Sequence, residues 1–216
     1  MKSYEILDEE SGEVSTVTLK PYEAIQENTG KVISKILYRT GKPVEYRFNG
    51  QTGTFQQGAD KILTDEKGKN VKSFSFIPVA WRMFEENLFA NNKKDNWVEL
   101  FFVDDKSRLS HLLLRNSSYN EFTKLDDELF YENIKLNECV LTLEPFKIEA
   151  IKSGEKVTWF ACKCTIEAAD AQQVQMLKAF VEDFPVFAER TLTATAVHVL
   201  ISPDYRLPVP TLLIAE

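Results

Sequence analysis

Short runs in which apolar and polar residues alternate recur along this chain, and they predict a protein built mostly from β-strands. These runs are rich in β-branched and aromatic residues, which favour the half-buried surface of a sheet. The clearest of them are residues 14–19 (VSTVTL), 44–48 (VEYRF), 73–79, 97–103 (WVELFFV), 109–114 (LSHLLL) and 191–201. Residues 31–55 contain turn signals at 40–43 and at Asn49-Gly50, so we expect a β-meander there.

The strongest strand signal is a pair of long runs in the second half of the chain. Residues 138–151 (ECVLTLEPFKIEAI) and 156–168 (KVTWFACKCTIEA) flank the turn sequence KSGE at 152–155. This arrangement predicts a long β-hairpin. Such hairpins are common in small closed barrels such as the OB-fold, and they also occur in sandwiches and in capsid or tail proteins.

Three segments show helical spacing instead of alternation. The sequence WRMFEENLF (81–89) places apolar residues at i, i+3 and i+7, which predicts a helix. A second helix is expected over about 118–129, where Ser118 begins a capping-box pattern. A third is expected over 171–183, with Asp170 as its N-terminal cap.

The order of these elements predicts the fold class. Many strands with about three helices, and no regular alternation of strand and helix, indicate a β-rich α+β fold. We expect an OB-like antiparallel barrel, closed or partly open, with the helices at its periphery. Residues 1–216 are expected to form a single domain with a mobile loop at 56–72 and an extended, proline-containing tail at 203–216. A break into two parts near 56–72 is the alternative.

The net charge of −7 hides an uneven distribution of charge along the chain. Residues 31–115 carry 15 basic and 10 acidic residues, whereas 1–30 carry 2 and 7, and 116–216 carry 9 and 16. The same middle block contains 12 of the 25 aromatic residues. Basic and aromatic residues that share one segment can form a surface for a polyanion with exposed bases.

This pattern leads to the first functional hypothesis. Proteins hold single-stranded nucleic acid with lysine and arginine on the phosphates and aromatic rings under the bases. We therefore predict a single-stranded nucleic-acid-binding protein, most naturally for DNA, which acts in replication, recombination or repair and is phage- or plasmid-like. The predicted contact residues are Lys35, Arg39, Lys42, Tyr46, Arg47, Phe55, Lys61, Lys67, Lys69, Lys72, Lys93 and Lys94. Tyr38, Tyr46 and Phe55 are the stacking candidates, and the hypothesis fails if the basic residues lie on opposite faces.

The alternative is a protein–protein interaction module or a virion structural protein that forms a homo-oligomer. It would use the same β-rich core, with an apolar patch around the terminal sequence PVPTLLIA. The acidic residues at 8–10 and the cluster at 126–132 are candidates for competing with nucleic acid or recruiting partners, and ordinary solvated acids are the simpler interpretation. A metal-dependent nuclease is a third hypothesis, with Asp104-Asp105 or the acids at 126–128 as ligands.

Catalysis has little support in the sequence. The phosphate-binding GxxxxGK[ST], dinucleotide-binding GxGxxG and hydrolase GxSxG motifs are absent, so we predict no enzymatic activity, cofactor or metal. His111 and His198 stand in strand-like runs, where a satisfied hydrogen bond is the expected state. Cys162 and Cys164 share a strand face, but a zinc site would need Cys139 and a further ligand, so buried free thiols are favoured.

The remaining features suggest where the protein works. Three cysteines are few and odd in number, which fits a reducing compartment without a disulfide framework. The acidic start MKSYEILDEESGE has no signal-peptide pattern, and no run is apolar enough for a membrane span. A cytoplasmic location is the expectation.

Overall fold

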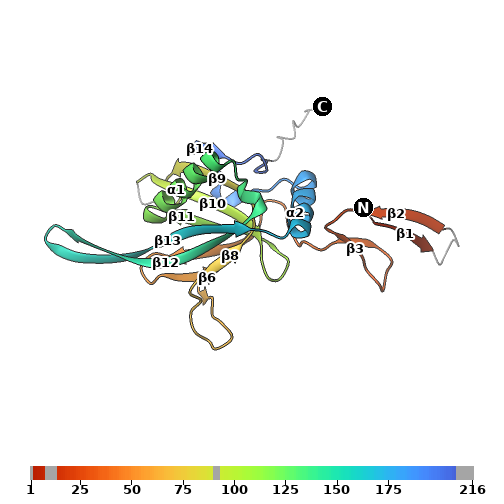
Figure 1. The fold of residues 1–216 in the computed structure, drawn as a ribbon, viewed down its shortest axis with the longest axis horizontal. Coiled ribbons are helices and arrows are strands. Elements are labelled where there is room, and N and C mark those ends of the chain that lie inside the picture. The colour runs from red at the N-terminus through yellow and green to blue at the C-terminus, as the bar shows by residue number, and fades with distance from the viewer. Residues whose placement is uncertain (1, 8–13, 90–92, 208–216) are drawn as a thin grey trace, which may run out of the picture.

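A seven-stranded sheet forms the centre of the fold in the computed structural model, which describes residues 2–7, 14–89 and 93–207 (Figure 1). In spatial order its strands are β14 (Val197–Ile201), β9 (Pro78–Glu86), β10 (Asp95–Val103), β11 (Leu109–Arg115), β5 (Val44–Asn49), β6 (Thr54–Gln57) and β7 (Lys61–Ile62). All neighbours are antiparallel except β11 and β5, which run parallel. Strands β14 and β7 are the two edges and do not pair, so this sheet is not closed into a barrel, and the expected OB-like barrel, closed or partly open, is not confirmed.

Three smaller sheets complete the β-structure of the described residues. They are a three-stranded sheet of β13 (Glu155–Ala168), β12 (Cys139–Lys152) and β8 (Phe74–Phe76), and the pairs β1 (Lys2–Leu7) with β2 (Val14–Leu19) and β3 (Glu23–Ile25) with β4 (Val32–Ser34). The predicted long hairpin is confirmed, because β12 pairs with β13 from Cys139 to Lys152. Ser153 and Gly154 turn it with φ values of 52° and 84°, the conformation of a tight hairpin turn.

The predicted meander over 31–55 is only partly correct. Strand β4 pairs with β3 and not with β5, while β5 pairs in parallel with β11 and antiparallel with β6. The β5–β6 turn spans 50–53, and Gly53 has a φ of +68°. The long-range parallel partner of β5 leaves no local sequence signal, which is why alternation alone suggested a meander.

Two α-helices are found in the described part of the chain, α1 (Ser117–Glu132) and α2 (Ala171–Asp183), together with short 3₁₀ turns at Leu136–Glu138 and Glu189–Thr191. The expected helices near 118–129 and 171–183 are confirmed, and the Asp170 side chain accepts a hydrogen bond from the Gln173 N–H as predicted. The capping box at Ser118 is wrong. The Ser118 hydroxyl is buried and accepts a hydrogen bond from the Cys162 N–H on β13 instead.

The helix predicted over 81–89 is wrong, since residues 78–86 form strand β9. This strand lies between β14 and β10, and both of its faces are covered. Met83 packs in the cluster under α1, while the next residue, Phe84, is fully buried on the opposite face. A strand that is buried on both faces does not alternate between apolar and polar residues. The apolar residues of 81–89 therefore match the spacing of a helix although the segment is a strand.

Two apolar clusters cover the two faces of the seven-stranded sheet. On one face, Phe122 and Leu129 of α1 pack with Leu100 of β10 and with residues of β12 and β13. On the other face, Phe180 of α2 packs with Phe101 of β10 and with the 186–188 segment. The seven-stranded sheet therefore lies between α1 with the three-stranded sheet on one face and α2 with the 186–188 segment on the other.

The segment 56–72 contains more β-structure than a simple loop. It includes β7 and a bridge between Thr64 and Asn70, which close a turn around Asp65. Figure 1 shows this segment as a narrow orange loop that projects from the body near β6. Of the predicted proline-containing tail, residues 208–216 lie outside the described residues.

Gly53 and Gly58 both have a left-handed backbone conformation. Comparing substitutions at the two positions tests the packing of Phe160, on the β12–β13 hairpin, against the β5–β6 turn. A β-carbon on Gly53 would lie 2.6 Å from Phe160 Cδ1, whereas one on Gly58 would meet nothing within 4 Å. We expect Gly58→Ala to lower the free energy of unfolding by about 1–2 kcal/mol through backbone strain. Gly53→Ala should cost about 1–3 kcal/mol more, because Phe160 must also move. Urea unfolding of both variants checks this, and equal losses would contradict the packing of Phe160 on this turn.

Candidate functional site

The residues predicted to contact nucleic acid lie in three separate regions. Lys35 and Arg39 flank Leu37, which bridges Arg108 just before β11. Lys94 lies just before β10, at the opposite end of the strands from Lys35 and Arg39. The nine residues of β10 separate these two ends by roughly 30 Å. The basic residues around Lys35, with Lys42, are thus far from Lys93 and Lys94, and the four lysines of 61–72 lie at the β7 edge.

The aromatic stacking candidates lie inside the protein. Tyr46 is 5% exposed and stacks on Phe74, and Phe55 is 1% exposed in the same cluster. The Tyr38 hydroxyl is part-buried and donates a hydrogen bond to the Phe187 carbonyl. A buried ring offers no face to a base, so the burial of Tyr46 and Phe55 does not favour the predicted stacking roles, which stay predictions.

Several of the predicted basic residues already have partners within the protein. Arg47 Nε lies 2.6 Å from Glu45 Oε1, and Lys42 Nζ lies 3.9 Å from Glu189 Oε2. Lys35 Nζ donates to the Pro21 carbonyl at 2.9 Å. These pairs reduce the positive potential that the middle block would otherwise present to a polyanion.

Asp104, which one hypothesis assigned to a metal, instead organises the β10–β11 turn. Its carboxylate accepts hydrogen bonds from Arg108 Nη2 at 2.6 Å, from the Tyr46 hydroxyl at 3.1 Å and from the Lys106 N–H at 3.0 Å. Burial alone would raise the pKa of Asp104, but the bonds from Arg108 and Tyr46 outweigh it and lower the pKa. Burial of the Tyr46 side chain and the nearby charge of Asp104 raise the pKa of Tyr46.

This lowered pKa predicts a pH dependence of stability. A carboxyl with a folded-state pKa below its unfolded value stabilises above the unfolded pKa, and that contribution disappears as pH falls through the folded pKa. Asp104→Asn should therefore be less stable than the wild type at about pH 7, with a difference that shrinks toward about pH 2.5. Tyr46→Phe should show a smaller change in the same direction. Urea unfolding across this pH range tests it, and a difference that grows with acid would contradict it.

A buried ionic network, which no local sequence pattern predicts, lies on the α2 side of the sheet. Arg82 on β9 faces Glu99 on β10 in direct register, with Nε 2.7 Å from Oε2. Their side chains are 1% and 0% exposed. His111 Nδ1 lies 3.0 Å from Glu99 Oε1, and the Thr191 hydroxyl donates to the same oxygen at 2.7 Å. The prediction that His111 is a hydrogen-bonded strand residue is confirmed.

This network holds the C-terminal segment on the sheet. Burial alone would raise the pKa of Glu99, but hydrogen bonding to His111 and the charge of Arg82 outweigh it, so the pKa is lowered and the carboxylate stays ionised. Arg82 Nη2 also donates to the Thr191 carbonyl at 2.9 Å. Since every charged group has a partner and Thr191 lies just before β14, we interpret the network as a structural clamp.

A small cavity of about 420 Å³ opens beside His111. Its charged lining is self-paired, because Glu45 binds Arg190 and Lys42 lies near Glu189. The lining contains no cysteine or serine that could act as a nucleophile.

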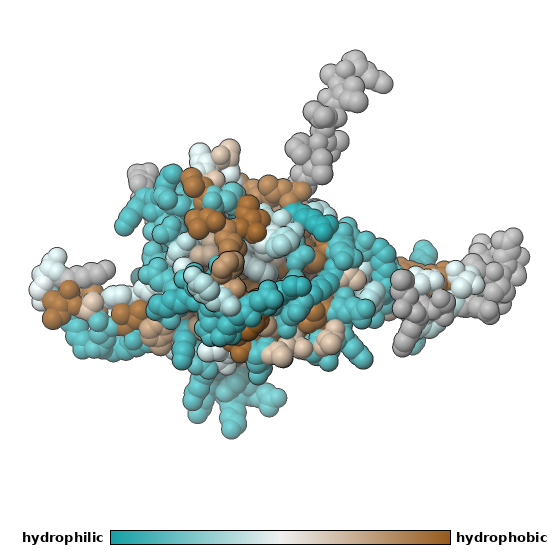
Figure 2. All heavy atoms as spheres, turned by 45° about the horizontal axis from the view of Figure 1, so that its top comes forward, coloured by the Kyte–Doolittle hydropathy of each residue, from teal (hydrophilic) through white to brown (hydrophobic). Residues whose placement is uncertain are grey.

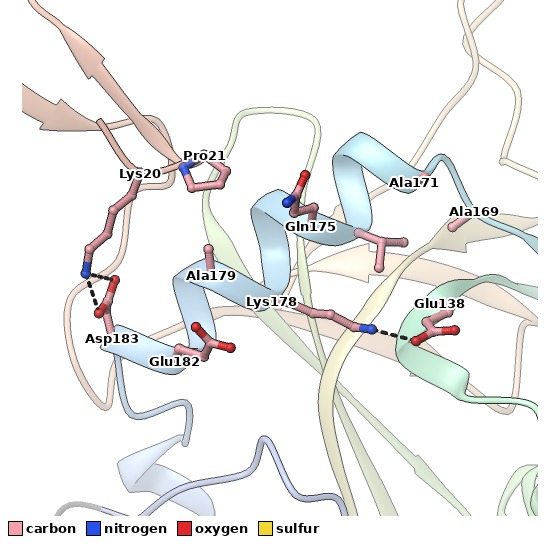
Figure 3. A pocket seen from close by; sticks show the side chains of 11 residues that line it. Lys20, Pro21, Glu138, Ala169, Ala171, Gln175, Lys178, Ala179, Glu182 and Asp183 are labelled. Atoms are coloured by element: carbon pink, nitrogen blue, oxygen red, sulfur yellow. Dashed lines mark hydrogen bonds and ion pairs between the residues drawn. The ribbon is translucent and has the colours of Figure 1, made fainter. Parts of the chain in front are cut away.

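A larger groove, of about 770 Å³, runs along α2 (Figure 3). Its floor is made of small and apolar side chains, which include Ala171 and Ala179. Lys178 pairs with Glu138 at 2.6 Å, and Lys20 pairs with Asp183 at 2.6 Å, as the dashed lines in Figure 3 show. Among the charged residues that line the groove, Lys20, Lys178, Glu138 and Asp183 are therefore engaged in ion pairs across it.

The last two turns of α1 carry an unusual surface, which we call the α1 patch: Asp127, Glu128, Phe130, Tyr131 and Glu132. Phe130 is 80% exposed and Tyr131 is 85% exposed, and their rings meet edge to face at 5.5 Å. None of the three acids forms an ion pair with a residue that the structure describes. The last turn of α1 contains no basic residue, so these acids oppose the helix dipole.

The α1 patch lies on the β14 side of the molecule. Leu129 of α1 and Leu200 of β14 belong to the same apolar cluster, and Asn137 Nδ2 donates to Asp204 Oδ2 at 2.8 Å. β14 is a sheet edge that exposes Val199 at 64%. Figure 2 brings this side forward and shows apolar surface gathered there.

The β12–β13 hairpin supplies a second exposed feature, the hairpin tip, defined as residues 149–158. The base of the hairpin is fixed, because the Phe160 N–H donates to the Gly50 carbonyl at 2.7 Å and Trp159 Nε1 donates to Ser117 Oγ at 2.9 Å. Figure 1 shows the tip projecting from the body, and Ile151 is 79% exposed. Glu149 pairs only within the hairpin, with Lys147 and Lys156.

Cysteines and acids do not assemble a metal site in the described residues, which contain no group of three or more metal-binding side chains. All three cysteines are free, and burial raises the pKa of Cys164 to about 12. Neither described helix has the length and apolar character that a bilayer-spanning helix needs. No protein family model matches the chain, and no curated protein or solved structure matches it significantly.

Proposed function

We propose that this protein is a non-enzymatic assembly subunit that binds further copies of itself through elements projecting from its central sheet. The observation that carries the proposal is the hairpin tip, which leaves the body and exposes Ile151 at 79%. A two-stranded hairpin is marginally stable in water without a surface to pack on. A neighbouring subunit would supply that surface and bury Ile151.

Two further features favour an assembly subunit over a protein that binds nucleic acid. Figure 1 shows β1 and β2 projecting on the side opposite to the hairpin tip, so the molecule has extended elements at both ends. The α1 patch exposes two large aromatic rings, and aromatic residues are enriched at protein interfaces. The predicted nucleic-acid residues, in contrast, are dispersed, and two of the three stacking candidates are buried.

Removal of the hairpin tip tests the proposal. We expect a variant in which an Asn-Gly turn joins Ile148 directly to Trp159 to lose self-association, while it keeps the fold, since the base contacts at Trp159 and Phe160 remain. Light scattering after size exclusion gives the mass, and circular dichroism with thermal unfolding is the control for folding. A truncated chain that keeps the mass of the wild-type oligomer would contradict the proposal.

A nucleic-acid role remains the second candidate because of one observation. Lys61, Lys67, Lys69 and Lys72 lie exposed on a single projecting segment, and none forms an ion pair with a described residue. Fluorescence anisotropy with labelled oligo-dT at about 50 and about 200 mM salt tests this candidate. Salt-sensitive binding that Lys67→Ala/Lys69→Ala weakens would support it, and absence of binding would remove it.

A further inference from the structure

We propose that the α1 patch of one copy binds the basic arm of a second copy, where the basic arm is residues 61–72. This inference rests on the proposed function, because it names the contact through which copies associate. The arm carries four lysines against two acids, and the α1 segment 126–132, which includes the α1 patch, carries four acids and no basic residue. The two surfaces are therefore complementary in charge.

The local structure of the basic arm leaves its lysines available to a partner. The backbone N–H groups of Lys67 and Lys69 both donate to Asp65 Oδ1 at 2.9 Å, so this carboxylate serves the turn. The Val71 N–H donates to the Leu63 carbonyl at 3.1 Å, which keeps the arm a narrow two-stranded projection. Ile62 is 42% exposed at its base and adds an apolar contact area.

The acids of the α1 patch likewise form no ion pair with a residue that the structure describes. Asp126 lies just before the patch, where burial raises its pKa and the neighbouring charge of Asp127 adds to the shift. Phe130 and Tyr131 stand between these acids and Glu132. An aromatic ring flanked by carboxylates suits a lysine, because the alkyl stem packs on the ring while the ammonium meets the acids.

The sheet order excludes a contact between the two surfaces within one chain. The basic arm extends β7, at one edge of the seven-stranded sheet, and the α1 patch lies beside β14, at the other edge. Figure 1 shows α1 and the orange loop of the arm on opposite sides of the body. Because the two surfaces lie on opposite sides of the body, one two-fold interface cannot contain both, so the contact is heterologous and forms a ring or a filament.

Charge reversal in separate variants tests this contact. The arm-reversed variant is Lys67→Glu/Lys69→Glu, and the patch-reversed variant is Glu128→Lys/Glu132→Lys. Each alone should self-associate about tenfold more weakly than the wild type or worse. An equimolar mixture of the two should regain association, because each reversed surface then meets an opposite charge on the other variant. Lys31→Glu/Lys106→Glu makes the same change in net charge as the arm-reversed variant, on exposed lysines elsewhere, and is its matched control.

Sedimentation velocity of the single variants, the mixture and the control gives outcomes that separate the two proposals. Weak association of each variant with recovery in the mixture supports the contact. If the wild type assembles and both variants assemble equally well, this contact is wrong while the proposed function stands. If the wild type is a monomer at every concentration, both are wrong. If the control weakens association as much as the arm-reversed variant, general charge explains the effect and the contact is wrong.

Discussion

Replacing Arg82 by alanine is expected to lower the free energy of unfolding by about 3–5 kcal/mol. The reason is the position of its partner: Glu99 is 0% exposed, so the change leaves a buried carboxylate without its cation. The substitution also removes the hydrogen bond to the Thr191 carbonyl and the contact of the guanidinium with the Phe84 ring at 4.0 Å. We expect loosening of the segment before β14 to accompany the loss.

Urea unfolding measures the loss, and a paired replacement identifies its cause. Arg82→Met/Glu99→Leu removes both charges and should be clearly more stable than Arg82→Ala, because no unpaired ion remains in the core. A loss below about 1 kcal/mol for Arg82→Ala would contradict the clamp, since surface pairs contribute that little. A double replacement that is less stable than the single one would show that the ion pair itself is strongly stabilising.

Replacing Phe122 by alanine should cost about 3–5 kcal/mol of unfolding free energy, whereas Phe130→Ala should change it by less than about 0.5 kcal/mol. Both residues lie on α1, but Phe122 is 0% exposed in the core cluster and Phe130 is 80% exposed. The pair therefore separates the face of α1 that holds the fold from the face that we assign to assembly. Phe130→Ala should weaken self-association instead.

Urea unfolding and light scattering on the same two variants check this division. Each variant serves as the control for the other, because both remove one phenylalanine ring from the same helix. A large loss of stability for Phe130→Ala would mean that this ring packs on the protomer and belongs to the fold. An unchanged mass for Phe130→Ala in an assembling wild type would remove the ring from the interface.

Local signals in the sequence predicted the elements whose contacts are local. The β12–β13 hairpin follows from two long strand runs around Ser153-Gly154, and α2 follows from Asp170 and a regular apolar stripe. The errors arose where distant partners decide the structure. Strand β9 is buried on both faces, which hid its alternation, and the parallel pairing of β5 with β11 joins segments more than sixty residues apart.

The candidate site shows the same division between features set by local sequence and features set by distant partners. The charge imbalance of the middle block is real, but a sequence count cannot tell that Arg47 is paired with Glu45 or that Tyr46 lies in the core. The acidic cluster at 126–132 was visible in the sequence as a partner-recruiting candidate. Its exposed aromatic pair became evident only when the structure showed which face of α1 packs on the sheet.

The mass of the wild-type protein in solution tests the central claim most directly. Size exclusion with light scattering, repeated over a wide range of protein concentration, gives the number of chains in the particle. Assembly through the hairpin tip and the α1 patch predicts a mass of several chains that decreases on dilution or at high salt. A mass of one chain at every concentration would contradict the account of this protein as an assembly subunit.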